Sequence, residues 1–219
     1  MGTIFQEEKE FRLKFIWGLL GLIWGISIPY SKAAAPFTIA GVRAEGMGVP
    51  LSKPPTSDNS FATIDNPEST VAGGSVTAIS NYFIGLGLSQ VKYTIHQNYF
   101  LKQYNYRSGT TETIDLTSVE LSSTFGRHFS IMGGVGYAIG TSGEIEYDNP
   151  VCKQFNRIAS DIEGINLIVG IGTPLYENLK FALGYRVTYA NITFSDPDLG
   201  TYKYKRTFSF VTAGLSYFF

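Results

Sequence analysis

Two charged residues, Glu120 and Arg186, each lie in the middle of a segment in which apolar residues alternate with small or polar ones. Alternation with a period of two predicts β-strands, and both charges share the small and polar face. An unpaired charge on an enclosed face is costly, so we expect the two to form an ion pair. Lys92 joins them if a β-bulge near Ser89–Gln90 shifts the alternation of its strand. Such a network either fills and closes a narrow barrel or forms an ion-selective constriction, and we expect the first.

A second candidate is the pair His128 and Ser130, in which a histidine could activate a serine hydroxyl as a nucleophile. The His-x-Ser spacing resembles that of the outer-membrane lipid A deacylases. Ile131, however, stands where that family has asparagine, and no acidic residue that would orient His128 is evident nearby. We therefore expect His128 to be a turn residue, and we expect no catalytic residue in this chain.

The residues that could bind a metal ion are few and scattered. His96 and His128 are the two histidines, and Cys152 is the one cysteine, which excludes an internal disulfide and a thiolate metal cluster. Five acidic residues could crowd at one rim of the fold, where we expect a solvated surface rather than a dedicated calcium site. These residues are Glu144, Glu146, Asp148, Asp161 and Glu163. No metal and no cofactor are expected.

The N-terminal segment predicts export. Phe15–Ile28 is a run of fourteen mostly apolar residues that follows two basic ones. A membrane-spanning helix needs roughly 20 apolar residues, so the run is short for a span and suits the core of a signal peptide. The small residues Ser31 and Ala33 have cleavage-site spacing, which predicts a signal peptide at 1–33 and a mature domain at 34–219. Cleavage two residues later and an uncleaved membrane anchor are the alternatives.

The composition argues against a nucleic-acid-binding protein and against an ordinary soluble domain. The formal net charge is −1, so no basic face is available to neutralise phosphates. Charged residues are only 16% of the chain, whereas 24 glycines, 14 tyrosines and 16 phenylalanines are abundant. An exported, aromatic-rich chain without a long apolar helix is typical of a transmembrane β-barrel.

Eight segments are predicted as strands. Those of the C-terminal half alternate in this way, with a bulky apolar face and a face of small or polar residues, whereas 71–80 is glycine-rich, alternates only loosely and is included because the topology requires it. A soluble β-sandwich would carry large apolar residues on its inner face. A narrow barrel in lipid reverses this arrangement, because large apolar residues contact lipid and small ones fill the lumen. The barrel is therefore favoured over a soluble sandwich or a lipocalin-like barrel. The predicted strands are 37–48, 71–80, 82–96, 118–125, 129–140, 164–172, 179–194 and 206–219.

The connections and the aromatic residues support the same topology. Short links at 80–81, 126–128 and 174–178 alternate with long polar ones at 49–70, 97–111, 147–158 and 195–205. This predicts tight periplasmic turns and long outer loops, with both chain ends in the periplasm. Aromatic residues should form two interfacial belts. The first comprises Phe83, Phe125, Phe129, Tyr176, Phe181, Tyr217 and Phe219, and the second Tyr93, Tyr99, Tyr147, Tyr189, Phe194 and Tyr202.

The last fourteen residues, RTFSFVTAGLSYFF, end in Phe219 with a second aromatic residue at Tyr217. They resemble the closing strand of bacterial outer-membrane β-barrels. The whole mature chain resembles the small eight-stranded barrels of the OmpA-transmembrane, OmpX and OmpW kind. The resemblance implies an all-β, eight-stranded antiparallel up-and-down barrel in the bacterial outer membrane of a Gram-negative cell.

It also implies partners and a function. The expected partners are outer-membrane lipid, lipopolysaccharide and the barrel-assembly machinery, which would recognise the strand ending in Phe219. We expect a monomer that binds no nucleic acid. The expected function is a structural or surface-interaction role through the extracellular loops, particularly 49–70. The alternatives are a narrow, porin-like channel or transporter for small hydrophobic or ionic solutes and, third, a lipid A-modifying enzyme.

Overall fold

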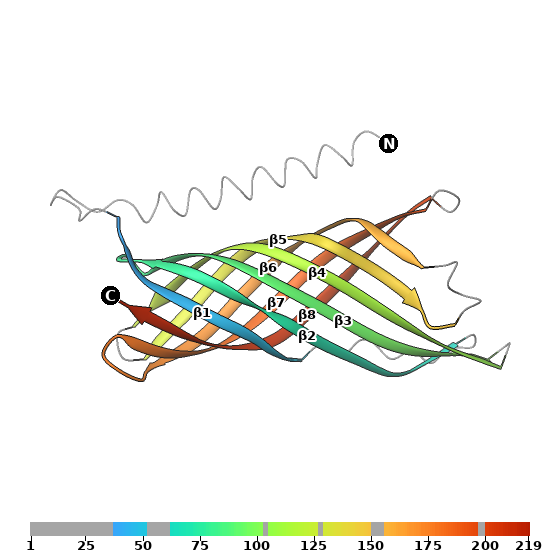
Figure 1. The fold of residues 1–219 in the computed structure, drawn as a ribbon, viewed down its shortest axis with the longest axis horizontal. Coiled ribbons are helices and arrows are strands. Elements are labelled where there is room, and N and C mark those ends of the chain that lie inside the picture. The colour runs from blue at the N-terminus through green and yellow to red at the C-terminus, as the bar shows by residue number, and fades with distance from the viewer. Residues whose placement is uncertain (1–36, 52–61, 103–104, 127–128, 150–155, 197–199) are drawn as a thin grey trace. The chain divides into compact units, whose positions relative to one another are not determined.

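The computed structural model describes residues 37–51, 62–102, 105–126, 129–149, 156–196 and 200–219. Residues 37–219 form one compact unit of eight antiparallel strands in a closed ring (Figure 1). No helix that is long and apolar enough to cross a membrane occurs among the described residues. The strands are β1 (Ile39–Pro50), β2 (Ala62–Ser80), β3 (Ile84–Leu101), β4 (Tyr106–Phe125), β5 (Ser130–Tyr147), β6 (Arg157–Pro174), β7 (Leu179–Asp196) and β8 (Gly200–Phe218).

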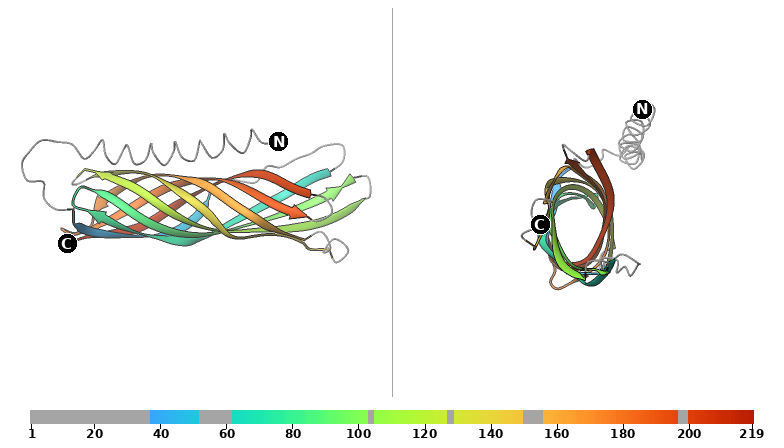
Figure 2. Two further views of the ribbon diagram at one scale, coloured as in Figure 1. Left: turned by 90° about the horizontal axis from the view of Figure 1, so that it is seen from above. Right: turned by 90° about the vertical axis from the view of Figure 1, so that its right-hand side faces the viewer.

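Each strand pairs with the next along the chain, and β1 pairs with β8 to close the ring, which is visible end-on in Figure 2. The predicted fold class, an eight-stranded up-and-down barrel, is confirmed. Three tight connections join β2 to β3, β4 to β5 and β6 to β7, at the three places where short links were expected. We call the half of the barrel that ends at these turns the lower half and the opposite half the upper half.

Most strands extend well beyond the predicted ones. β2–β8 contain 18 to 20 residues each. The predicted long loops at 97–111 and 195–205 are therefore wrong, because β3, β4 and β8 continue through most of these residues. The predicted loop 49–70 is too long, because 62–70 belong to β2. The error has a physical cause: polar residues on the outside of the upper half break the lipid-facing pattern without ending the strands.

β1 is the exception, with 12 residues. It pairs with β2 as far as Gly46 opposite Gly74, and with β8 as far as Pro50 opposite Phe210. In the described part of the chain, no strand joins β8 to β2 above this level.

β3 shows how the two halves differ. In its lower part, Leu86 and Leu88 are exposed on the outside. In its upper part, Val91 and Tyr93 are buried inside and Lys92 is exposed on the outside. The predicted bulge near Ser89–Gln90 is wrong, since β3 pairs with β4 without a break. The apolar residues of β3 thus face outward in the lower half and inward in the upper half, because the outside of the barrel is apolar below and polar above. Lys92 consequently lies outside the lumen.

Candidate functional site in the barrel lumen

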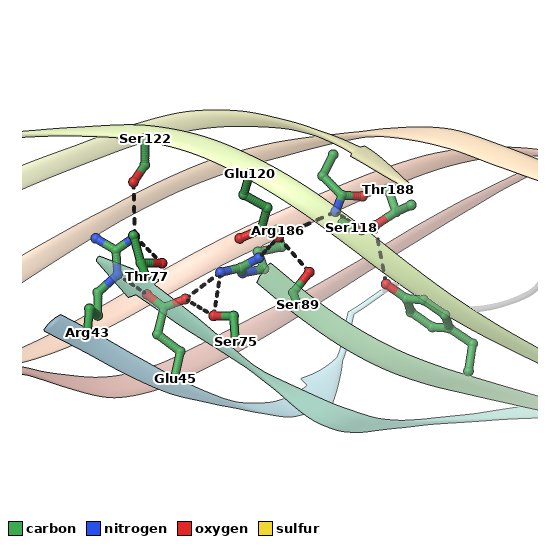
Figure 3. Close-up of polar contacts among 12 residues, drawn as sticks. Arg43, Glu45, Ser75, Thr77, Ser89, Ser118, Glu120, Ser122, Arg186 and Thr188 are labelled. Carbon is green, nitrogen blue, oxygen red and sulfur yellow. Dashed lines mark hydrogen bonds and ion pairs between the residues drawn. The ribbon is translucent and has the colours of Figure 1, made fainter. Parts of the chain in front are cut away.

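The lower half of the lumen holds a chain of buried charges, which we call the lower charge network: Arg43, Glu45, Glu120 and Arg186. Arg186 on β7 reaches Glu120 on β4 and lies 2.5 Å from Glu45 Oε2 on β1 (Figure 3). The side chains of Arg186, Glu45 and Glu120 are at most 2% exposed. The structure thus brings the predicted residues Glu120 and Arg186 together, but Lys92 does not take part.

Arg43 extends the network toward the lower end. Its Nε lies 3.2 Å from Glu45 Oε1, and its Nη2 donates to Ser122 Oγ at 3.2 Å. Two arginines therefore alternate with two glutamates, and the network carries no net charge. Sequence reasoning missed Arg43 and Glu45. Their signal was present, because they occupy alternate positions in the first predicted strand and so share one face.

Short polar side chains orient these charges. Ser75 Oγ donates to Glu45 Oε2 at 3.2 Å and accepts from Arg186 at 2.9 Å. Ser89 Oγ donates to Glu120 Oε1 at 2.7 Å. Hydrogen bonds to charged groups are the stronger ones, and they offset part of the cost of burying the ions. The small residues of the lumen face are therefore the immediate surroundings of the network.

An apolar layer fills the lumen of the upper half. The Tyr93 ring stacks on Phe208 with centroids 4.0 Å apart and meets Phe210 edge-on at 5.7 Å. The hydroxyl of Tyr93 forms a 3.3 Å hydrogen bond with Thr188 across the lumen. This upper apolar cluster comprises Val91, Tyr93, Ile95, Ile114, Leu116, Ala138, Ile162, Ala190, Ile192, Phe194, Phe208 and Phe210.

The upper apolar cluster corrects the prediction of the second aromatic belt. Tyr93 is 2% exposed and Phe194 is 3% exposed, so neither contacts lipid. Tyr189, by contrast, is 51% exposed on the outside, as predicted. Aromatic residues point inward in the upper half because an outside wetted by water leaves the lumen as the place to bury them.

The outside of the lower half is apolar. The exposed belt includes Val42, Val76, Leu86, Leu88, Val119, Ile131, Tyr137, Ile139, Leu167, Val169, Ile171, Leu183, Tyr185 and Leu215, with the half-buried Val135 and Val211 among them. An apolar patch of this extent on a closed wall requires an apolar solvent. On β4 the belt runs over the nine residues from Thr117 to Phe125, and on β7 over the eleven from Leu179 to Tyr189. A tilted membrane-spanning strand needs about 9–11 residues.

The chain is a transmembrane β-barrel. Single-chain transmembrane barrels with an even number of antiparallel strands are typical of the bacterial outer membrane, and this barrel lies there. Exposed aromatic residues mark the lower edge of the belt, among them Phe125, Phe129, Tyr176, Tyr217 and Phe219. This is the lower aromatic belt that the sequence predicted.

Comparison with known proteins gives structural similarity only. No protein-family model matches the barrel, and no curated protein matches it. Neisserial surface protein A is 13% identical, with 84% of this chain and 100% of that chain covered and a TM-score of 0.49. Outer membrane protein OprG from Pseudomonas aeruginosa is 15% identical over 84% and 95% of the two chains, with a TM-score of 0.40. Outer membrane protein AlkL is 12% identical over 88% and 96%, with a TM-score of 0.44.

A second polar cluster lies above the apolar cluster and outside the membrane-spanning residues. Arg206 Nη2 donates to Glu112 Oε2 at 2.6 Å, and the Tyr204 hydroxyl donates to Glu112 Oε1. Burial, together with the adjacent Glu112 carboxylate, raises the pKa of Tyr204 above its ordinary value. The phenol therefore stays protonated, as a donor to a carboxylate.

The remaining candidates do not form a site. His96 Nδ1 lies 2.9 Å from Thr111 Oγ1 on the exposed surface, and Glu163 accepts from the Tyr137 hydroxyl. Among the described residues, no group of three or more His, Cys, Asp or Glu side chains could hold a metal ion. His128 and Cys152 lie outside the described residues. Ser130 is buried, and its Oγ donates to the Gly172 carbonyl at 3.4 Å.

Proposed function

We propose that this barrel does not conduct solutes and that it acts as a structural and surface-interaction protein through its extracellular end. The observation that supports this most directly is that side chains meet across the lumen at three heights. Arg186 contacts Glu120, Tyr93 contacts Thr188 and Phe208, and Arg206 contacts Glu112. These contacts join strands on different sides of the ring.

The order of the three layers opposes ion passage. An ion that enters from either end meets arginines and glutamates that already form ion pairs with one another and carry no net charge. It would then have to cross the apolar cluster, where no water replaces its hydration shell. Near the lower mouth, beside Arg43, Ser130 and Lys180, a cavity of about 10 Å³ remains, which is room for about one water molecule.

Conductance in planar lipid bilayers tests this proposal. We expect no channel steps from the refolded wild-type barrel. The double substitution Tyr93→Ala with Phe208→Ala, which removes the stacked rings, serves as the control and should open a conducting path. Steady wild-type conductance whose ion selectivity changes with Glu120→Gln would instead favour the alternative, a narrow channel or transporter for small hydrophobic or ionic solutes.

A lipid A-modifying activity is less well supported. Ser130 lies inside the wall and already donates to a backbone carbonyl, whereas the acyl chains of a lipid contact the outer face. A lipid A mass spectrum that changes when the gene is deleted, and recovers with wild type but not with Ser130→Ala, would favour the enzyme.

The remaining parts of the proposal concern export and assembly. Residues 1–33 would be a signal peptide removed before Ala34, and the strand ending in Phe219 would engage the barrel-assembly machinery. The mature barrel would act as a monomer surrounded by lipid and lipopolysaccharide. N-terminal sequencing of the outer-membrane form tests the cleavage site, and a mobility shift between boiled and unboiled samples on SDS gels tests folding.

A further inference from the structure

We propose that the outer face of β7 and β8, just above the apolar belt, binds the phosphate groups of lipopolysaccharide through Lys203 and Lys205. The inference rests on the outer-membrane location and not on whether the lumen conducts. A conductance measurement therefore leaves it unaffected. Four observations about this face support the proposal: its height above the apolar belt, the outward direction of the two lysines, their uncharged neighbours, and the contrast with Lys92, which lies opposite a carboxylate.

The height follows from the change of polarity along the wall. The last large apolar residues on the outside are Leu88 on β3, Val119 on β4, Ile139 on β5 and Tyr189 on β7. Directly above them the outside becomes polar on every one of these strands. The residues there include Lys92, Asp115, Thr141, Ser142, Asn191 and Thr193. The boundary between hydrocarbon and headgroups therefore lies at this level.

The upper half then stands in the headgroup and sugar layer. On β4, the eleven residues Tyr106–Leu116 lie above the boundary. At about 3.4 Å per residue and a tilt near 40°, they rise roughly 28 Å. Measured from the apolar belt, the upper connections are long and the lower ones short, which places the upper half on the extracellular side.

Lys203 and Lys205 face outward at this level. Both are exposed, and among the described residues neither has a hydrogen-bond or ion-pair partner. Lys205 lies opposite Asn191 on β7 and Lys203 lies opposite Thr193, so their nearest cross-strand neighbours are uncharged. Two ammonium groups with amide and hydroxyl neighbours, above an apolar wall, match a lipid that carries phosphates above its acyl chains.

The pairing of a third lysine sharpens the assignment. Lys92 is also exposed on the outside just above the boundary, but it lies opposite Asp115 on β4. A carboxylate at a cross-strand position reduces the positive potential that an anion would meet. Lys92 therefore provides a control of equal charge and similar height without the same binding site.

These lysines have a competing explanation. No described strand pairs with the free side of β8 at residues 200–209, and lysines protect exposed strand edges from pairing with other chains. Edge protection predicts no preference for phosphate. A binding measurement that varies only the phosphate separates the two explanations.

The test measures binding of lipid A, with and without its phosphates, to the full mature barrel in detergent micelles. For the double substitution Lys203→Gln with Lys205→Gln, we expect roughly 25-fold weaker binding of lipid A, or about fivefold per lysine. Removing the phosphates from lipid A should weaken wild-type binding to a similar extent. Lys92→Gln should leave binding within about twofold of wild type, because Asp115 already opposes its charge.

Three results would overturn the proposal: unchanged binding by the double variant, equal binding of lipid A without phosphates, or loss of binding with Lys92→Gln as well. If inorganic phosphate at the same concentration displaced lipid A completely, the ligand of this face would be a free anion and not the lipid. If the double variant does not fold, the salt dependence of wild-type binding decides, since affinity that does not fall with added salt excludes the phosphate contacts.

Discussion

The guanidinium of Arg186 on β7 lies 2.5 Å from the carboxylate of Glu45 on β1, although 141 residues separate the two in the chain. β1 and β8 are the strands that close the barrel, and β7 is the neighbour of β8. The contact therefore ties the two sides of the closing seam together from within the lumen. Arg186 also contacts Glu120 on β4, so one side chain holds three strands.

Replacing Arg186 with methionine should lower the free energy of unfolding by about 3–5 kcal/mol, because Glu45 and Glu120 would remain buried without their shared partner. The loss of stability can be measured by urea unfolding in lipid, with the folded fraction read from the mobility shift on SDS gels. Arg107→Met changes an exposed arginine and should cost less than about 0.5 kcal/mol. Equal effects of the two variants would contradict a structural role for the network. Adding Glu120→Gln to Arg186→Met should recover part of the stability, because Glu45 still pairs with Arg43 and no buried carboxylate is then left without a partner.

Replacing Tyr93 with alanine should cost about 3–5 kcal/mol, since it removes a ring that packs between Phe208 and Phe210. Hydrogen exchange should increase mainly in the upper parts of β3 and β8. Leu88→Ala changes an outward-facing residue at the top of the apolar belt. It should lower the free energy of unfolding much less, because lipid fills the space left by the leucine side chain. A larger loss from Leu88→Ala would mean that the upper apolar cluster does not stabilise the wall.

Gly136 should tolerate no side chain. A Cβ at this position would lie 2.9 Å from Glu120 Cγ and 3.0 Å from the Val119 carbonyl. Gly136→Ala should therefore destabilise the barrel by about 1–3 kcal/mol. Gly133 lies on the same strand with nothing within 4 Å of its Cβ position. Gly133→Ala should be neutral or stabilise by up to about 1 kcal/mol, and a similar loss for both variants would refute the crowding argument.

The height of the membrane can be tested with arginine on one strand. Leu121 and Thr113 both face outward on β4, below and above the boundary. Leu121→Arg should cost about 2–4 kcal/mol because it places a charge near the bilayer centre. Thr113→Arg should change stability by less than about 0.5 kcal/mol. A comparable cost at Thr113 would show that lipid covers the upper half as well.

Tyr204 should resist ionisation. Its pKa is raised by burial and by Glu112 above the value of about 10 for a free tyrosine. The stability that this phenol contributes is therefore fully present below about pH 10. It is lost only as the pH rises through the higher pKa of the folded state. At a pH just above 10, phenolate absorbance of the folded barrel should be the same for wild type and Tyr204→Phe. A lower signal for the variant would mean that Tyr204 ionises like an exposed tyrosine.

Several features of the candidate site were predictable from local patterns. Glu120 and Arg186 stand on the small-residue face of strands with a clear period of two, so both were expected inside. Lys92 was placed wrongly because the inward shift of Val91 and Tyr93 was attributed to a bulge. The shift instead marks the height at which the strand passes from lipid into water. A bulge and a change of surroundings give the same sequence pattern, and only the unbroken register of β3 with β4 distinguishes them.

The sequence by itself determined the strand count, the order of the strands and the lipid-facing side of the lower half. These depend on alternation and turn residues, which are properties of neighbouring positions. The tertiary structure alone decided that Glu45 joins Arg186, and that Tyr93 and Phe194 lie inside rather than in an aromatic belt. Both depend on ring closure, which brings distant strands face to face across one lumen. They also depend on how far each strand rises above the membrane, and no local pattern encodes that distance.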